Sequence, residues 1–86
     1  MSDFNRRVSI PKNLLKAFGK TEEVYICKID GFDNLFIIKK PSNVSNEDKI
    51  LDIRLLDDKG RFSWSRVKNK EVQIFLQGKD LYLEIN

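Results

Sequence analysis

Apolar and polar residues alternate with a period of two along much of this chain, which is typical of β-strands that bury one face. Val24–Ile29 and Leu35–Ile38 are separated by turn-forming residues and predict a hairpin. Val72–Leu76 and Leu81–Ile85 predict a second hairpin around a glycine-containing turn. The C-terminal part of each half of the chain is therefore expected to be a pair of antiparallel strands.

Three shorter strands are predicted outside these hairpins, at Val8–Ile10, Ile50–Leu56 and Arg61–Ser65. In the last of them, the alternation places Phe62 and Trp64 on one face and the serines on the other. Two aromatic residues at this spacing could stack on bases, but packing in the core is several times more common for such a pattern. We therefore expect Phe62 and Trp64 in the core.

One helix is predicted, over residues 11–18. Pro11 fits the first helical position, and Gly19 follows as a helix terminator. A helix of this length is unstable alone, so its apolar stripe of Leu14, Leu15 and Phe18 is expected to lie against the sheet. Seven strands and one helix give a mainly β fold, for which we expect a small closed or nearly closed barrel that hides its strand edges.

The chain also contains an internal repeat. Residues 3–11 and 57–65 share the order acidic residue, three residues, arginine, apolar residue, serine, apolar residue. Each copy is followed by one of the two predicted hairpins. A unit this small cannot close a core alone, so pairing two units is the usual solution. We predict one domain, 1–86, composed of a first unit (1–40), a connector (41–49) and a second unit (50–86).

Charge is segregated along the chain, although the net charge is only +3. Residues 1–20 hold five basic side chains against one acidic side chain, and residues 59–79 hold six against one. Residues 21–58, in contrast, hold nine acidic side chains against five basic ones. Most charge runs are solvated surface. Because these basic clusters accompany both copies of the repeat, they also indicate related surfaces that face an anion.

The composition argues against catalysis. The chain has no histidine, which excludes an imidazole-based triad and a histidine metal site. Its four glycines are scattered at predicted turns and form no phosphate-binding loop. Cys27 cannot form an internal disulfide and is expected to be a buried thiol. We therefore expect no enzyme activity, no cofactor and no metal. No apolar run reaches membrane-spanning length and no secretory signal is present, so we expect a cytoplasmic protein without a membrane partner.

The segments RRVSIPKNLLKAFG and VYICKIDGFDNLFIIKK, followed by PSN, resemble the DNA-binding domain of the AbrB family of bacterial transition-state regulators. The segments IRLLDDKGRFSWS and VQIFLQGKDLYLEI resemble the same unit, and two such units in one chain are similar to the MraZ proteins. The resemblance implies a swapped-hairpin barrel and a sequence-selective regulator, bacterial or phage, that binds double-stranded DNA. Whether one chain completes the barrel or two chains form a homodimer stays open.

The resemblance also implies residue roles. Arg7 and Arg61 match the arginine that closes the acid-to-arginine turn, Arg54 matches a basic residue on the strand before it, and Lys16 occupies a helix position where the family often has arginine. Arg7 and Arg61 can equally pair with Asp3 and Asp57, four residues earlier. Basic residues around the repeats complete the predicted DNA-binding set, which is Arg6, Arg7, Lys12, Lys16, Arg54, Lys59, Arg61 and Arg66.

Several positions depart from the family pattern. Arg6 replaces the usual turn glycine, Leu15 stands where a second helix arginine is expected, and the second unit has no helix. These departures keep an alternative open, in which the fold serves as a protein-interaction or assembly module without DNA binding. An antitoxin is a weaker alternative, because the last residues form a strand pattern rather than a flexible acidic tail.

Overall fold

The computed structural model describes residues 7–86, and it confirms a mainly β fold. The predicted seven strands and one helix are all present, with boundaries shifted by one or two residues. The elements, in chain order, are β1 (Arg7–Ser9), α1 (Lys12–Phe18), β2 (Glu23–Lys28), β3 (Leu35–Lys39), the 3-10 turn η2 (Pro41–Asn43), β4 (Lys49–Leu55), β5 (Arg61–Ser63), the 3-10 turn η3 (Ser65–Val67), β6 (Val72–Gln77) and β7 (Asp80–Ile85).

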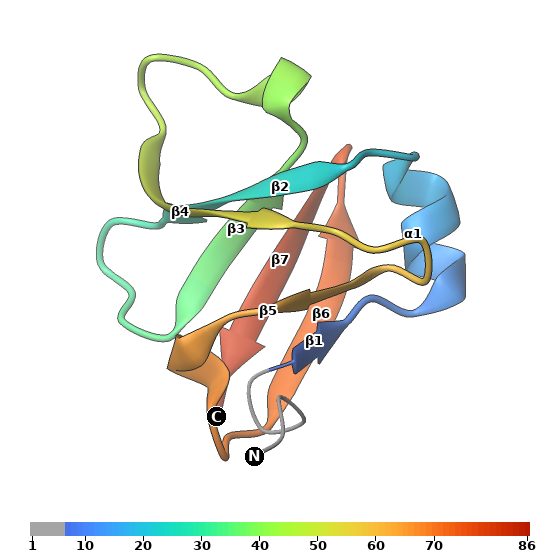
Figure 1. Cartoon of the computed structure of the whole chain (residues 1–86). Helices are drawn as coiled ribbons and strands as arrows, with labels where there is room; N and C mark the ends of the chain where they lie inside the picture. Colours follow the sequence, from blue (N-terminus) through green and yellow to red (C-terminus); the bar gives the residue numbers. More distant parts are fainter. Residues whose placement is uncertain (1–6) are drawn as a thin grey trace.

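The strands form two antiparallel sheets rather than a closed barrel. Five strands are arranged in the order β4-β2-β3-β7-β6, and β1 pairs with β5 in a separate two-stranded ribbon. Figure 1 shows this ribbon crossing the larger sheet. Among the described residues, β4 and β6 are the edges of the larger sheet. Because β1 and β5 have only three residues each and pair with one another, they do not bridge these two edges.

The two halves of the chain occupy related positions in both sheets. In the ribbon, Val8 lies opposite Phe62, and these residues occupy equivalent places in the two copies of the repeat. In the larger sheet, β3 and β7 are neighbours, and each is flanked by its own hairpin partner, β2 or β6. β4 is the exception, because it precedes β5 in sequence but pairs with β2. The two halves are therefore interleaved.

The core lies between one face of the larger sheet and the ribbon. Val8, Ile10, Phe62 and Trp64 are each at most 3% exposed and pack against the buried side chains of β2, β3 and β7. The Trp64 ring meets Phe36 edge-on, with 5.1 Å between ring centroids and an interplanar angle of 89°. The expectation that Phe62 and Trp64 belong to the core is confirmed.

α1 covers one end of this core. Phe18 is buried, and Leu14 and Leu15 pack partly against the same cluster. The helix ends at Gly19, whose φ of 100° lies in the region that favours glycine. Gly60, in the turn between β4 and β5, lets the Leu15 side chain approach closely, because a Cβ at this position would lie only 2.7 Å from Leu15 Cδ2. The helix therefore packs directly on the turn between β4 and β5.

In β4, the charged side chains of Asp52 and Arg54 face the core side of the sheet, and the apolar side chains of Ile53 and Leu55 face away from it. Arg54 lies opposite Val24, which faces the core, and Ile53 lies opposite Tyr25 on the other face. As a result Ile53 is 47% exposed and Leu55 is 77% exposed. The predicted connector, 41–49, contains η2, and its last residue, Lys49, is the first residue of β4.

Replacing Trp64 with alanine should destabilise the fold by about 3–5 kcal/mol, because a large buried aromatic leaves a cavity. Urea unfolding followed by circular dichroism measures this loss. Phe32→Ala is the matched control, since Phe32 is 50% exposed and its removal should change stability little. Equal unfolding midpoints for the two variants would show that the ring of Trp64 is not part of the core.

Candidate nucleic-acid interface

The outward side of the β1–β5 ribbon displays arginine and serine. Because Val8 and Phe62 point into the core, the alternation of a strand turns Arg7, Ser9, Arg61 and Ser63 outward. We call these four residues the ribbon face. Arg7 lies opposite Ser63, and Ser9 lies opposite Arg61. The two arginines therefore occupy diagonal positions that are related by the local symmetry of the ribbon.

Arg61 is held in place by the turn that precedes it. Its Nε donates a 2.9 Å hydrogen bond to Asp57 Oδ2, and its backbone N–H donates a 2.8 Å bond to Asp57 Oδ1. The Lys59 N–H also donates to Oδ1, at 2.9 Å. The predicted pairing of Asp57 with Arg61 is thus confirmed. Because a guanidinium has five N–H donors, one bond from Nε is compatible with a further contact to an anion.

These bonds also set the protonation of Asp57. The backbone N–H of Arg61 is the largest cause that lowers the pKa of this carboxyl, and the Arg61 guanidinium and the Lys59 N–H act in the same direction. Burial opposes them. The equivalent pair in the first repeat is predicted to be Asp3 with Arg7, but Asp3 lies outside the described residues, as does Arg6.

Lys12 and Lys16 lie at one end of the ribbon. α1 follows β1 directly, and both lysine side chains are exposed. They line an open groove of about 800 Å³ between α1 and the turn after β4. Lys59 belongs to the same end, because the neighbouring Gly60 carbonyl accepts the Ile10 N–H at 2.9 Å. This end is not purely basic, since Glu22, Asp57 and Asp58 also line the groove.

Arg66 lies at the other end of the ribbon. η3 follows β5 as α1 follows β1, and antiparallel strands send their following elements in opposite directions. The Arg66 guanidinium is 5.9 Å from the ring centroids of both Phe36 and Trp64, which is within the range of a cation–π contact. The structure therefore places predicted basic residues at both ends of the ribbon face.

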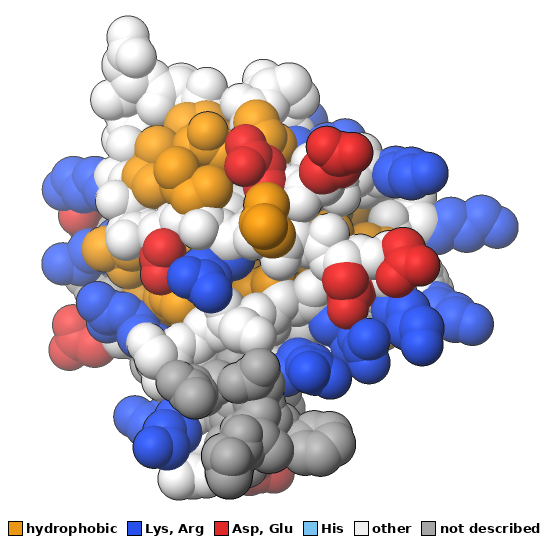
Figure 2. Space-filling model, in the orientation of Figure 1, with side chains coloured by type: hydrophobic (Ala, Val, Ile, Leu, Met, Phe, Trp, Pro, Cys, Tyr) orange, Lys and Arg blue, Asp and Glu red, His pale blue; other side chains and the backbone are white. Residues whose placement is uncertain are grey.

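Arg54 differs from the other predicted contacts. It lies on β4 in the larger sheet, half-buried, and its Nε is fully covered without a hydrogen-bond partner among the described residues. Figure 2 shows basic side chains on two sides of the visible surface, with acidic side chains among them on the side where Figure 1 places α1. The basic residues thus flank the ribbon rather than forming one uninterrupted patch in this view.

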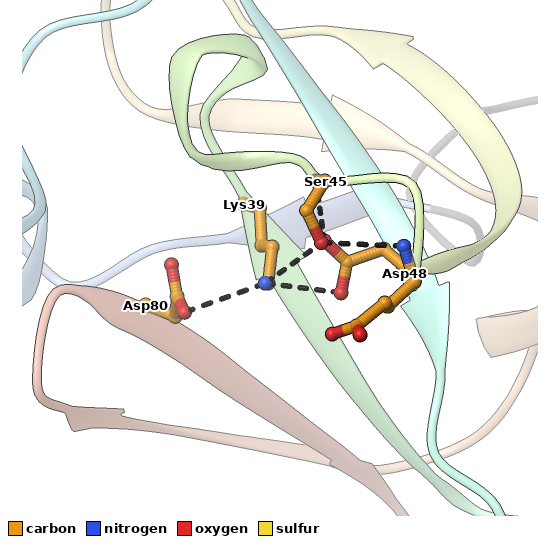
Figure 3. A network of polar contacts seen from close by, with 5 residues as sticks. Lys39, Ser45, Asp48 and Asp80 are labelled. Atoms are coloured by element: carbon orange, nitrogen blue, oxygen red, sulfur yellow. Dashed lines mark hydrogen bonds and ion pairs between the residues drawn. The ribbon is translucent and has the colours of Figure 1, made fainter.

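A second polar cluster holds the connector between β3 and β4 (Figure 3). Lys39 Nζ lies 3.0 Å from Asp48 and 4.0 Å from Asp80, and the Ser45 N–H donates a 2.8 Å hydrogen bond to Asp48. The Ser45 N–H and then Lys39 hold the pKa of Asp48 below its ordinary value. Sequence analysis missed this cluster, because its members are separated along the chain and Lys39 ends an otherwise apolar strand.

Cys27 lies beside this cluster and is 1% exposed. Burial is the main cause that raises the pKa of its thiol, and the nearby Asp48 charge adds to the effect. A protonated, covered thiol is a poor nucleophile and a poor metal ligand. The cluster therefore fits a structural role, in which it ties the connector to β3 and β7.

Within residues 7–86, no group of three or more metal-ligating side chains comes together. In the same part of the chain, no helix has the length and apolar character required to cross a bilayer. Comparison with known proteins gave no significant match to a family model, a curated protein or a solved structure.

Asp57→Ala should lower the thermal stability of the protein at neutral pH, because three hydrogen bonds to the carboxylate are lost. A carboxyl whose pKa is lowered by folding stabilises the protein above its unfolded-state pKa, which is about 3.9, and loses this effect as pH falls further. Melting curves between about pH 7 and pH 2 test this. The difference between wild type and variant should shrink at the acidic end; a difference that is constant with pH would contradict the assignment.

Proposed function

We propose that this protein binds double-stranded DNA through the ribbon face and acts as a sequence-selective transcriptional regulator. One observation carries the proposal, namely a two-stranded antiparallel ribbon that turns Arg7 and Arg61 outward and has further basic side chains at both ends. The major groove of B-DNA, about 12 Å wide, admits a two-stranded β-ribbon. The inner face of the ribbon packs against the core, and this packing holds the outward side chains in place.

The residues divide into two roles. Arg7 and Arg61 begin the two strands of the ribbon and face outward, where a guanidinium can bond to guanine edges or to phosphate. The serines beside them are short donors that suit phosphate oxygens. The flanking basic residues suit phosphates on either side of the groove, and they are Lys12, Lys16, Lys59 and Arg66. Local two-fold symmetry in the ribbon favours a target with related sequences on both strands.

The pairing pattern supports a relationship to AbrB-like swapped-hairpin proteins. β4 of the second half pairs with β2 of the first half, and β1 of the first half pairs with β5 of the second. Such interleaving of two related units within one chain is what a tandem form of a swapped-hairpin domain requires. The same pattern supports the proposed division into a first unit, 1–40, and a second unit, 50–86.

A second function, that of a protein-interaction module, is favoured by a different observation. β4 exposes Ile50, Leu51, Ile53 and Leu55, and their exposed fractions range from 39% to 77%. Exposed apolar side chains on a sheet edge are typical of surfaces that contact another protein. The two functions are compatible, because β4 and the ribbon face belong to different sheets.

Fluorescence anisotropy with labelled duplexes selected from a randomised pool tests DNA binding. With about five phosphates neutralised, the logarithm of affinity should fall against the logarithm of salt concentration with a slope of roughly −4 to −5. Absence of binding to any selected duplex at low salt would overturn the proposal.

Arg61→Ala should weaken binding to the selected duplex by about tenfold or more. Lys79→Ala is the matched control, because it also removes one positive charge but lies in the turn between β6 and β7. Circular dichroism confirms that both variants fold. If the two variants lose affinity equally, the effect is one of net charge, and the ribbon face is not the binding surface.

A further inference from the structure

β4 is an edge strand that carries a bulge near Leu51 and charged side chains on its inner face, but its segment 52–55 is regular. It forms one side of the larger sheet, with no described strand beyond it. The Leu56 N–H donates to the Glu22 carbonyl at 2.9 Å, so the alternation of an antiparallel ladder turns the backbone of Ile53 and Leu55 away from β2. The Ile53 N–H accordingly bonds only to the side chain of Asp52, at 2.9 Å. Pairing with another strand would replace this bond and leave the Asp52 carboxylate to a facing side chain.

The two faces of β4 carry different side chains. Ile53 and Leu55 extend from the outer face and are exposed, whereas Leu51 stands at a bulge and lines a pocket with Phe36 on the inner face. Figure 2 shows apolar side chains gathered where Figure 1 draws β2 and β4. Asp52 and Arg54 lie on the inner face, opposite Ile26 and Val24. Arg54 Nε is covered yet has no hydrogen-bond acceptor among the described residues, which is an unfavourable state for a charged group.

We infer that β4 pairs antiparallel with β4 of a second copy of this chain, with Ile53 facing Ile53 of that copy at the two-fold axis. In this register Asp52 of each copy lies opposite Arg54 of the other, so the interface holds two pairs of opposite charges. On the outer face, Ile53 of each copy then lies opposite its mate and diagonal to Leu55 of the other, so these exposed apolar side chains meet.

The backbone geometry agrees with this register. Outward-facing Ile53 would form a hydrogen-bonded pair with its symmetry mate, and the Asp52–Arg54 pairs then fall at non-hydrogen-bonded positions, where opposing side chains are closest. The bulge in β4 near Leu51 leaves residues 52–54 regular, and these residues carry the pairing. The strand is self-complementary in shape and charge, which is the requirement for a symmetric interface.

The other sheet edge, β6, offers a weaker surface. It has no charged side chain within Val72–Gln77, so self-pairing there would gain no ion pair inside the strand. Phe75 is its most exposed large apolar residue at 37%, compared with 77% for Leu55. The β4 interface does not depend on DNA binding. It would place two ribbon faces in one assembly.

Charge reversal tests the register. An interface of one strand pair is small, so dissociation in the micromolar range is expected, and sedimentation of the full chain at about 10–200 µM should detect dimers. Arg54→Asp places like charges opposite Asp52 and should weaken dimerisation by at least about tenfold. The double variant Asp52→Arg/Arg54→Asp restores opposite charges and should restore the dimer. A monomeric wild type, or a double variant as weak as the single one, would overturn the inference.

Cross-linking tests the two-fold axis independently of any effect on folding. Directly opposed residues in a hydrogen-bonded antiparallel pair have Cα atoms about 5.5 Å apart, a spacing that a disulfide can bridge. Ile53→Cys should therefore form a covalent dimer under mild oxidation, whereas Gln73→Cys, exposed on β6, should not. Native Cys27 is buried and should not contribute. Cross-linking through Gln73→Cys but not Ile53→Cys would place the contact on the wrong edge.

Discussion

The antiparallel pairing of β1 with β5 determines both what the core contains and what the ribbon face exposes. Val8 and Phe62 meet at the centre of this ribbon and turn inward, so the first and second halves of the chain are joined over one core. Because side chains alternate along a strand, the residues next to Val8 and Phe62 point outward, and these are Arg7, Ser9, Arg61 and Ser63. A single geometric fact therefore accounts for both the buried apolar cluster and the exposed arginines.

The symmetry of the ribbon also explains where the basic residues lie. α1 and η3 leave the ribbon at opposite ends, so the basic residues that follow each copy of the repeat are separated by the length of the strands. Two basic ends with arginines between them form an elongated surface, which suits a linear polyanion better than a small ligand. Acidic residues near α1 reduce the local charge, and Asp57 serves to orient Arg61 rather than to bind a ligand.

The sequence predicted the elements well because each element is encoded locally. The alternation around Phe62 and Trp64, and Pro11 with Gly19 around the helix, do not depend on distant residues. The prediction was less complete for contacts between distant elements. β4 pairs with β2 instead of closing a barrel, and this register turns Leu55 outward and Arg54 inward, which alternation within β4 alone cannot determine. The Asp57–Arg61 pair was predicted because its two members lie within one turn, whereas the Lys39–Asp48–Asp80 cluster unites three segments.

Amide chemical-shift mapping of the isotope-labelled protein shows whether the ribbon face contacts DNA. Titration with a selected duplex should shift the amides of β1 and β5 most, followed by those of α1 and η3 at the two ends of the ribbon. Shifts concentrated on the outer face of the larger sheet, around Ile37 and Tyr82, would contradict the claim, because that face lies on the other side of the sheet from the ribbon.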